Sequence, residues 1–242
     1  MGVEKDANLP PVVILAGGLG TRLRSMVADR PKILAPIDGK PFLYILIQWL
    51  KAQGVHRLIF SLGYKAEQVI KALSLYRELD GVRVEYVIEA EPKGTLGGLS
   101  LALNRLSVDE CLVINGDTFV DLDLNHFLYQ HRNRNSAALA TVKVNDPSRY
   151  GCLTFKNEDV IESFEEKSAL QRVHSWINAG IYYFSSEATN VIKTFDKGAI
   201  EQEFFSNRKL ELAYSKYSDC SFLDIGTPES YGRAAKVLKE YL

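Results

Sequence analysis

A short apolar strand runs directly into a turn of glycines in the stretch Val12-Val13-Ile14-Leu15-Ala16-Gly17-Gly18-Leu19-Gly20-Thr21-Arg22. The β-branched residues before the glycines are typical of a buried parallel strand. Glycine lacks a Cβ, so backbone N–H groups in this turn could approach a phosphate chain, and Arg22 could add a planar bidentate donor. A tight turn with an exposed arginine would fit the glycines equally well. The spacing matches neither G-x-G-x-x-G nor the P-loop pattern.

Strand-like and helix-like segments alternate along the first 145 residues. Strands are predicted over 12–15, 57–62, 82–88, 111–114 and 137–144, and helices over 41–53, 66–79, 99–106 and 124–133. This alternation favours a Rossmann-like, mixed but mainly parallel sheet with helices on both faces. Later segments indicate a hairpin of 152–155 with 160–164, strands over 179–184 and 222–225, and a helix from Pro228 to the end. We expect one α/β domain whose second half carries inserted antiparallel strands.

Charge and cysteine content exclude several classes of protein. The 29 Lys and Arg residues against 30 Asp and Glu give a formal net charge of −1, so no global basic field exists to hold a nucleic acid. Three well-separated cysteines, Cys111, Cys152 and Cys220, favour a reducing compartment over a disulfide framework or zinc site. The longest apolar run, Phe42 to Ile47, is too short to span a bilayer, and the start of the chain lacks a leader pattern. We expect a cytoplasmic protein that binds neither nucleic acid nor membrane.

The residues that follow each strand are the candidate ligand-binding residues, because ligands of such sheets bind beyond the carboxyl ends of the strands. Lys32 comes shortly after the glycine turn and could meet the same phosphates. The segment Glu89 to Gly98, called the base loop below, follows the third predicted strand. Glu89 could accept the N1–H and the exocyclic amine of guanine, while Gly94 and Thr95 could contact the base through their backbones. A loop that only caps the next helix is the alternative.

Two aspartates, Asp117 and Asp224, lie at the ends of predicted strands and within two residues of a glycine. Two converging carboxylates could hold one Mg²⁺ that bridges phosphates, although a turn or N-cap role is the ordinary alternative for each. Polar residues also mark the antiparallel strands, in 164–167 and at Asn178. Sugar hydroxyls need such donors and acceptors, but exposed edge strands carry them too.

Together these motifs resemble the sugar-1-phosphate nucleotidylyltransferases, from about Val12 to Tyr231. The family pattern L-x-G-G-x-G-T-R-L is present as Leu15 to Leu23. The resemblance implies nucleotide binding by Leu15, Ala16, Gly17, Gly18, Gly20, Thr21, Glu89, Pro92, Gly94, Thr95, Asn115 and Gly116. It implies catalytic roles for Arg22, Lys32 and Lys167, sugar binding by Tyr150, Gly151, Glu166 and Asn178, and Mg²⁺ ligation by Asp117 and Asp224. The implied fold is that of the nucleotide-diphospho-sugar transferases.

Within this family the chain is most similar to the D-glycero-α-D-manno-heptose 1-phosphate guanylyltransferases, through segments such as Asn115 to Phe119, Arg149 to Gly151 and Ser163 to Lys167. It departs from the family pattern at Lys93 and Leu96, so its base loop differs in detail from the base loop of the family. The implied substrates are GTP and the heptose 1-phosphate, and the products are GDP-heptose and pyrophosphate. The expected division is 10–145 for the nucleotide, 146–227 for the sugar and 228–242 as a C-terminal helix. Since the sequence ends at 242, no left-handed β-helix is expected.

Three alternatives stay open on the sequence alone. The first changes the substrate, to mannose 1-phosphate with GTP or to a hexose 1-phosphate with UTP or dTTP. The second is a non-catalytic regulatory subunit that binds a nucleotide-sugar, which would be expected to lose a metal-binding aspartate or a phosphate-binding cation. The third is a glycosyltransferase, whose usual D-x-D motif has a counterpart in Asp121-Leu122-Asp123. A homo-oligomer would be compatible with the apolar residues between 186 and 217.

Overall fold

The computed structural model describes residues 9–23, 26–134, 136–147, 150, 152–157, 160–165, 175–205 and 212–242. Three residues predicted to bind the sugar phosphate, Gly151, Glu166 and Lys167, lie outside this described part. None of the helices within it is both long and apolar enough to cross a membrane.

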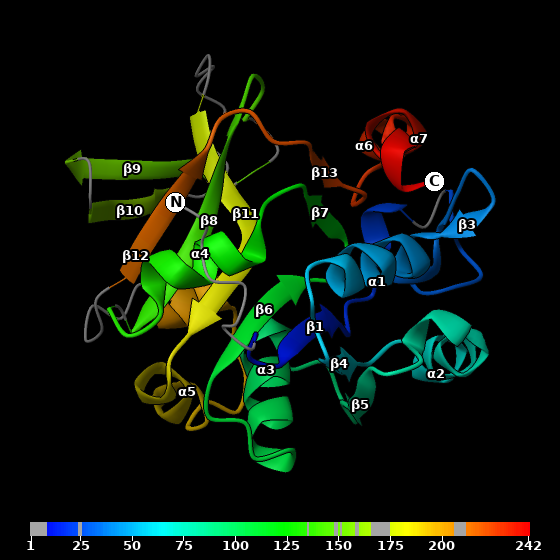
Figure 1. Cartoon of the computed structure of the whole chain (residues 1–242), viewed down its shortest axis with the longest axis horizontal. Helices are drawn as coiled ribbons and strands as arrows, with labels where there is room; N and C mark the ends of the chain where they lie inside the picture. The colour runs from blue at the N-terminus through cyan, green and yellow to red at the C-terminus, as the bar shows by residue number, and fades with distance from the viewer. Residues whose placement is uncertain are drawn as a thin grey trace.

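A mixed sheet forms the centre of the molecule (Figure 1). Its order is β10-β9-β11-β6-β1-β4-β5, and β8 pairs with β11 and with β12. The parallel strands are β1 (Val12–Ala16), β4 (Arg57–Leu62), β5 (Arg83–Ile88) and β6 (Cys111–Asn115). The remaining strands are β8 (Ala137–Val144), β9 (Cys152–Asn157), β10 (Val160–Glu165), β11 (Ser175–Phe184) and β12 (Leu212–Tyr217). Since β11 runs antiparallel to β6, β8 and β9, it joins the two halves, and the predicted fold class is confirmed.

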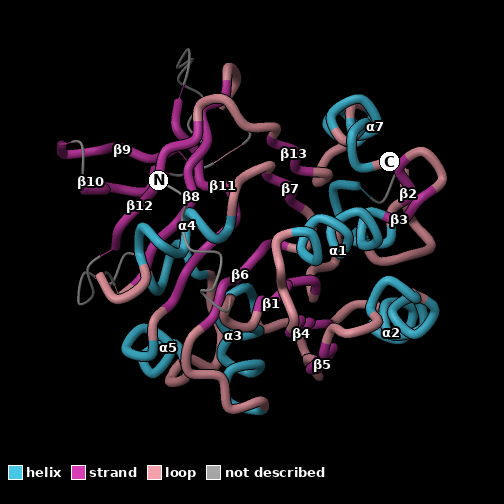
Figure 2. The backbone as a smooth tube through the Cα atoms, in the orientation of Figure 1, coloured by secondary structure: helices cyan, strands magenta, loops and turns pink. Residues whose placement is uncertain are grey.

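Helices cover both faces of the parallel half (Figure 2). Alternate residues of a strand point to opposite faces, and β1 shows this directly. Val12 and Ile14 pack in one apolar cluster with α1 (Phe42–Ala52), α2 (Ala66–Leu75) and α4 (Leu124–His131). Val13 packs in a second cluster with α3 (Gly94–Arg105) and α5 (Ser186–Ile192). The sheet is therefore buried from both sides, which leaves its strand ends as the place for a site.

Some helix boundaries differ from the prediction. Helix α3 begins at Gly94 rather than near residue 99, so the base loop ends inside its first turn. Glycines lower helix propensity, but packing against the segment that follows α5 outweighs this local preference. The predicted helix 66–79 stops at Leu75 because Tyr76 is extended, and a 3-10 turn, η3 (Arg77–Leu79), follows. The predicted C-terminal helix is divided into α6 (Pro228–Gly232), α7 (Ala234–Val237) and a 3-10 turn, η5 (Lys239–Tyr241).

Several short elements complete the fold, and the sequence predicted one of them, the strand over 222–225. A two-stranded ribbon forms from β7 (Thr118–Val120) and β13 (Phe222–Asp224), which pair antiparallel. A small hairpin joins β2 (Pro36–Ile37) to β3 (Lys40–Pro41) through Asp38 and Gly39, both at positive φ, as in an Asp-Gly turn. The other short elements are the 3-10 turns η1 (Thr21–Leu23) and η2 (Lys32–Leu34) and the π-helix η4 (Ile200–Phe204). Of these, η1 and η2 carry residues that line the candidate site, and β7, β13 and η4 contact residues of the site.

Candidate active site

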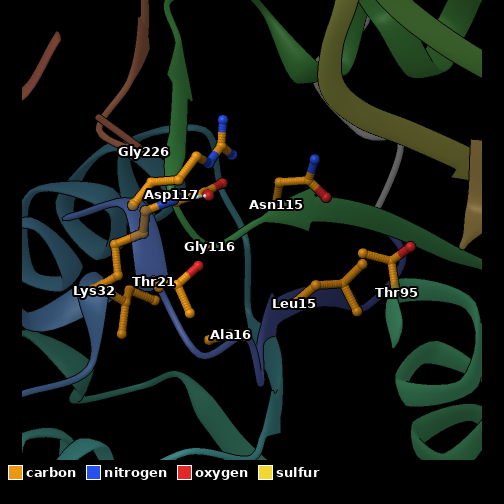
Figure 3. A pocket seen from close by; sticks show the side chains of 13 residues that line it. Leu15, Ala16, Thr21, Lys32, Thr95, Asn115, Gly116, Asp117 and Gly226 are labelled. Carbon is orange, nitrogen blue, oxygen red and sulfur yellow. Dashed lines mark hydrogen bonds and ion pairs between the residues drawn. The ribbon is translucent and has the colours of Figure 1, made fainter. Parts of the chain in front are cut away.

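A cleft of about 280 Å³ opens at the carboxyl ends of β1 and β6 (Figure 3). Its lining comprises Leu15, Ala16, Gly18, Gly20, Thr21, Arg22, Lys32, Ile33, Thr95, Asn115, Gly116, Asp117 and Gly226. Every one of these residues except Ile33 and Gly226 had been predicted to bind nucleotide or metal or to act in catalysis. The cleft lies where the parallel strands meet the antiparallel β11, which is the kind of strand edge at which α/β sheets bind ligands.

The glycines of the first turn differ in backbone conformation and in what surrounds them. Gly20 adopts a φ of +59°, in the left-handed region that favours glycine. A Cβ on Gly18 would meet no atom within 4 Å, so this residue leaves the cleft open. A Cβ on Gly17 would lie 2.6 Å from Oε1 of Glu89, a separation that real Cβ atoms essentially never show. Gly17 thus leaves room for the carboxylate of Glu89 behind the turn, and its contact with a nucleotide stays a prediction.

A lysine and two aspartates meet on the other side of the cleft. Nζ of Lys32 donates to Oδ2 of Asp117, and their side chains are 13 % and 34 % exposed. Oδ1 of Asp224 accepts the N–H of Gly226 at 2.6 Å. A Cβ on Gly226 would lie 2.5 Å from Oδ1 of Asp224 and 3.0 Å from Nζ of Lys32, which shows how closely these groups approach. The ribbon of β7 and β13 causes this meeting, because Asp224 pairs with Thr118.

The electrostatics of the two aspartates differ. Burial opposes ionisation of Asp117, but the charge and the hydrogen bond of Lys32 outweigh it and lower the pKa of Asp117. Burial, followed by the charge of Asp117, raises the pKa of Asp224. The charges of Lys32 and Arg22 both favour ionisation of Asp224, but they do not outweigh its burial and the repulsion from Asp117. Such a pair fits Mg²⁺, which takes carboxylate, phosphate and water oxygens. Since the described residues hold no cluster of three or more His, Cys, Asp or Glu suited to a metal, phosphate and water would complete the ligand shell.

The base loop contributes Thr95 to the cleft, while Glu89, Pro92 and Gly94 lie outside its lining. Oε2 of Glu89 accepts the N–H of Lys93 at 3.0 Å, and its Oε1 accepts the hydroxyl of Ser61 at 3.3 Å. The carboxylate is therefore held behind the glycine turn. Its reading of a guanine base, like the roles of Pro92 and Gly94, stays a prediction.

A segment from the second half of the chain, residues 198–200, is hydrogen-bonded to the base loop. The N–H of Gly198 donates to the carbonyl of Lys93, and the N–H of Leu96 donates to the carbonyl of Gly198, both at 2.9 Å. The N–H of Ile200 donates to Oγ1 of Thr95 at 3.0 Å. The cleft residue Thr95 thus takes its orientation from η4, a contact that no pattern in the sequence indicates.

On the sugar side, the structure describes Tyr150 and Asn178. Tyr150 packs edge-to-face against Phe222 of β13, with 5.6 Å between ring centroids. Asn178 in β11 donates its amide protons to Oη of Tyr182 at 2.8 Å and to Oε1 of Glu201 at 3.1 Å. Sequence reasoning found neither Tyr182 nor Glu201. The Asn178-x-Gly180-x-Tyr182 spacing is the only signal that could have pointed to Tyr182, and Glu201 stands outside every motif.

Known proteins are similar to this chain over nearly its whole length. The family model described as "Nucleotidyl transferase" matches residues 11–240. A D-glycero-alpha-D-manno-heptose 1-phosphate guanylyltransferase from Campylobacter jejuni is 39 % identical over 219 residues, covering 90 % of this chain and 96 % of that protein. A protein of the same name from Aneurinibacillus thermoaerophilus is 34 % identical over 232 residues, covering 95 % and 99 %. The crystal structure of HddC from Yersinia pseudotuberculosis complexed with GMP-PN is similar with a TM-score of 0.83, at 36 % identity and with 94 % and 99 % covered.

Proposed function

This chain belongs to the nucleotidyl transferase family, and on that premise we propose that it transfers a guanylyl group from GTP to D-glycero-α-D-manno-heptose 1-phosphate, giving GDP-heptose and pyrophosphate. The observation that carries the proposal is the cleft in which the glycine turn, Arg22, Lys32 and Asp117 converge, with Asp224 next to the cleft residue Gly226. Two heptose 1-phosphate guanylyltransferases matched over nearly their whole length support the choice of sugar. The similar structure complexed with GMP-PN supports the choice of a guanine nucleotide.

The proposed reaction needs no nucleophile from the protein. A phosphate oxygen of the sugar 1-phosphate attacks the α-phosphorus of GTP, and the bond from that phosphorus to the leaving pyrophosphate breaks. The attacking oxygen is already an anion at neutral pH, so no proton has to be removed. Because two polyanions repel each other, the protein must position them and neutralise their charge.

Cations of this chain take the main roles in the proposal. Arg22 lines the cleft and would bind the triphosphate and the departing pyrophosphate as a bidentate donor. Lys32 would contact the α-phosphate, and its present partner Asp117 already directs it toward the cleft. Lys167 is assigned to the phosphate of the sugar by resemblance alone. The nucleotide would lie against the glycine turn, Thr95, Asn115 and Gly116, and the sugar against Tyr150, Gly151, Glu166 and Asn178.

Asp117 and Asp224 are the proposed Mg²⁺ ligands, since burial and mutual repulsion of these carboxylates favour a bound cation. When bound, the ion would supply positive charge at the α-phosphate. We also propose that residues 10–145 bind the nucleotide and 146–227 the sugar, in the cytoplasm. The free thiols of Cys111 and Cys220 are in keeping with a reducing compartment.

The test is release of pyrophosphate with Mg²⁺, for GTP, UTP, dTTP, CTP and ATP against heptose, mannose and glucose 1-phosphates. We expect release with GTP and the manno-heptose phosphate. Arg22→Ala should lower this activity by roughly two to three orders of magnitude. The matched control Arg30→Ala should keep it, because Arg30 lies outside the cleft and pairs with the neighbouring Asp29. Release with another nucleotide and sugar phosphate would change the assigned substrates. No release from any pair would overturn the proposed activity.

A further inference from the structure

Four polar side chains form a hydrogen-bonded cluster between the cleft and η4. The hydroxyl of Tyr182, which is fully buried, donates to Oε1 of Glu201 at 3.0 Å. Asn178 donates to the same two side chains, and its Oδ1 accepts the N–H of Gly180 at 2.9 Å. The amide of Asn115, which lines the cleft, also hydrogen-bonds to the Tyr182 hydroxyl. The cluster thus joins the nucleotide cleft to a predicted sugar-binding residue.

The direction of each hydrogen bond in this cluster follows from chemistry. An ionised carboxylate only accepts, so the single proton of the Tyr182 hydroxyl points to Glu201. Burial and the charge of Glu201 raise the pKa of Tyr182, so this proton stays in place. Tyr182 can then only accept from Asn115, which requires the nitrogen of that amide to face inward. The Asn115 side chain also lies close to Gly180, where a Cβ would be 2.8 Å from Nδ2 of Asn115.

Both amide nitrogens are therefore turned toward the protein. Asn178 donates its two N–H protons to Tyr182 and Glu201. Its Oδ1 accepts the N–H of Gly180 with one lone pair, and its second lone pair can accept a further hydrogen bond. What the cluster can offer a ligand is a carbonyl oxygen. A sugar hydroxyl that meets Asn178 must then donate its proton.

We infer that Glu201 is a positioning residue that, directly and through Tyr182, keeps both N–H protons of the Asn178 amide engaged and leaves only its carbonyl oxygen for a ligand, so that Asn178 recognises a sugar hydroxyl only as a hydrogen-bond donor. The inference rests on the proposed function for the identity of the ligand. It assigns to Glu201 a part in substrate specificity without direct contact with the reacting atoms.

The experiment compares binding of α-manno-configured sugar 1-phosphates with analogues in which one ring hydroxyl is replaced by fluorine, measured by calorimetry. Fluorine has no proton to donate, so the analogue altered at the hydroxyl facing Asn178 should bind wild-type protein about tenfold or more weakly. In Glu201→Ala the amide of Asn178 can rotate and donate a hydrogen bond to the ligand. The affinities for the hydroxyl compound and its fluorine analogue should then differ by no more than about threefold. Glu201→Gln should largely restore it, because its side-chain oxygen can accept the same two hydrogen bonds. Glu203→Ala, on the exposed side of η4, should behave as wild type.

Melting temperatures of all variants are measured alongside, since a purely structural role would change stability without changing discrimination. If Glu201→Ala does not fold, Tyr182→Phe replaces it, because loss of the hydroxyl removes an acceptor from both amides. The inference is overturned if folded Glu201→Ala, or its replacement, keeps the wild-type preference for hydroxyl over fluorine. It is also overturned if wild-type protein shows no such preference at any ring position. Binding without release of pyrophosphate would refute the proposed function and leave this inference standing.

Discussion

Replacing Gly94 by alanine should push the base loop away from the backbone of Gly198, to which the loop is hydrogen-bonded. Gly94 has a φ of +73°, and a Cβ there would lie 2.4 Å from the carbonyl oxygen of Gly198, against the 3.0 Å that real Cβ atoms respect. The neighbouring hydrogen bonds of Lys93 and Leu96 to Gly198 would stretch as the backbones separate. The left-handed conformation costs an alanine about 1–2 kcal/mol. Weakening two hydrogen bonds adds roughly 1–3 kcal/mol.

The expected loss is therefore about 2–5 kcal/mol of unfolding free energy. For a chain of this size it corresponds to a melting temperature lower by roughly 5–15 °C, which differential scanning calorimetry measures directly. Gly232→Ala is the matched control, since a Cβ there meets no atom within 4 Å and the residue ends helix α6. It should leave the melting temperature unchanged or raise it. A melting temperature for Gly94→Ala within about 1 °C of wild type would refute the argument from this contact.

Further expectations concern the cleft and its supports. Arg22→Ala should lower kcat by roughly two to three orders of magnitude with the melting temperature unchanged. A near-normal kcat would contradict the proposed role of Arg22 at the triphosphate. Glu89→Gln should raise KM for GTP relative to UTP, and an unchanged preference would place base reading elsewhere. Thr95→Val leaves the buried N–H of Ile200 without its acceptor and should cost about 1–3 kcal/mol in a urea titration, whereas Thr95→Ser should cost less. Chelation with EDTA should abolish pyrophosphate release and added Mg²⁺ should restore it, and release that persists in EDTA would contradict the metal role of the aspartates.

The parallel half of the fold could be predicted because its strands are continuous apolar runs bounded by turns. For the same reason much of the cleft could be located in advance. Parallel strands bring their carboxyl ends to one edge, so residues as far apart as Thr21 and Asn115 converge without any knowledge of side-chain packing. The glycine turn was recognisable from composition, although Gly17 turned out to accommodate Glu89 from behind.

The contacts that complete the site depend on packing and could not be predicted. Strand β13 is recognisable as a short strand, but its partner β7 has three residues, too few to show a period, and so the pairing that joins Asp224 to Asp117 was not foreseen. Helix α3 was placed too late because its glycines oppose a helix, yet Gly97 is needed where the carbonyl of Asp196 would lie 2.5 Å from a Cβ. The role of Glu201 depends on a π-helix, for which sequence periodicity offers no template.

The ribbon of β7 and β13 also has a consequence for synthesis of the chain. The glycine turn, Lys32 and Asp117 are all made within the first half, and they could already collapse into the parallel sheet while translation continues. Asp224 is made much later, and it approaches Lys32 and Asp117 because β13 pairs with a strand made about a hundred residues earlier. A growing polypeptide is thus expected to lack the pair of aspartates until β13 has been made, so the proposed metal site forms only after both halves of the sheet have been synthesised.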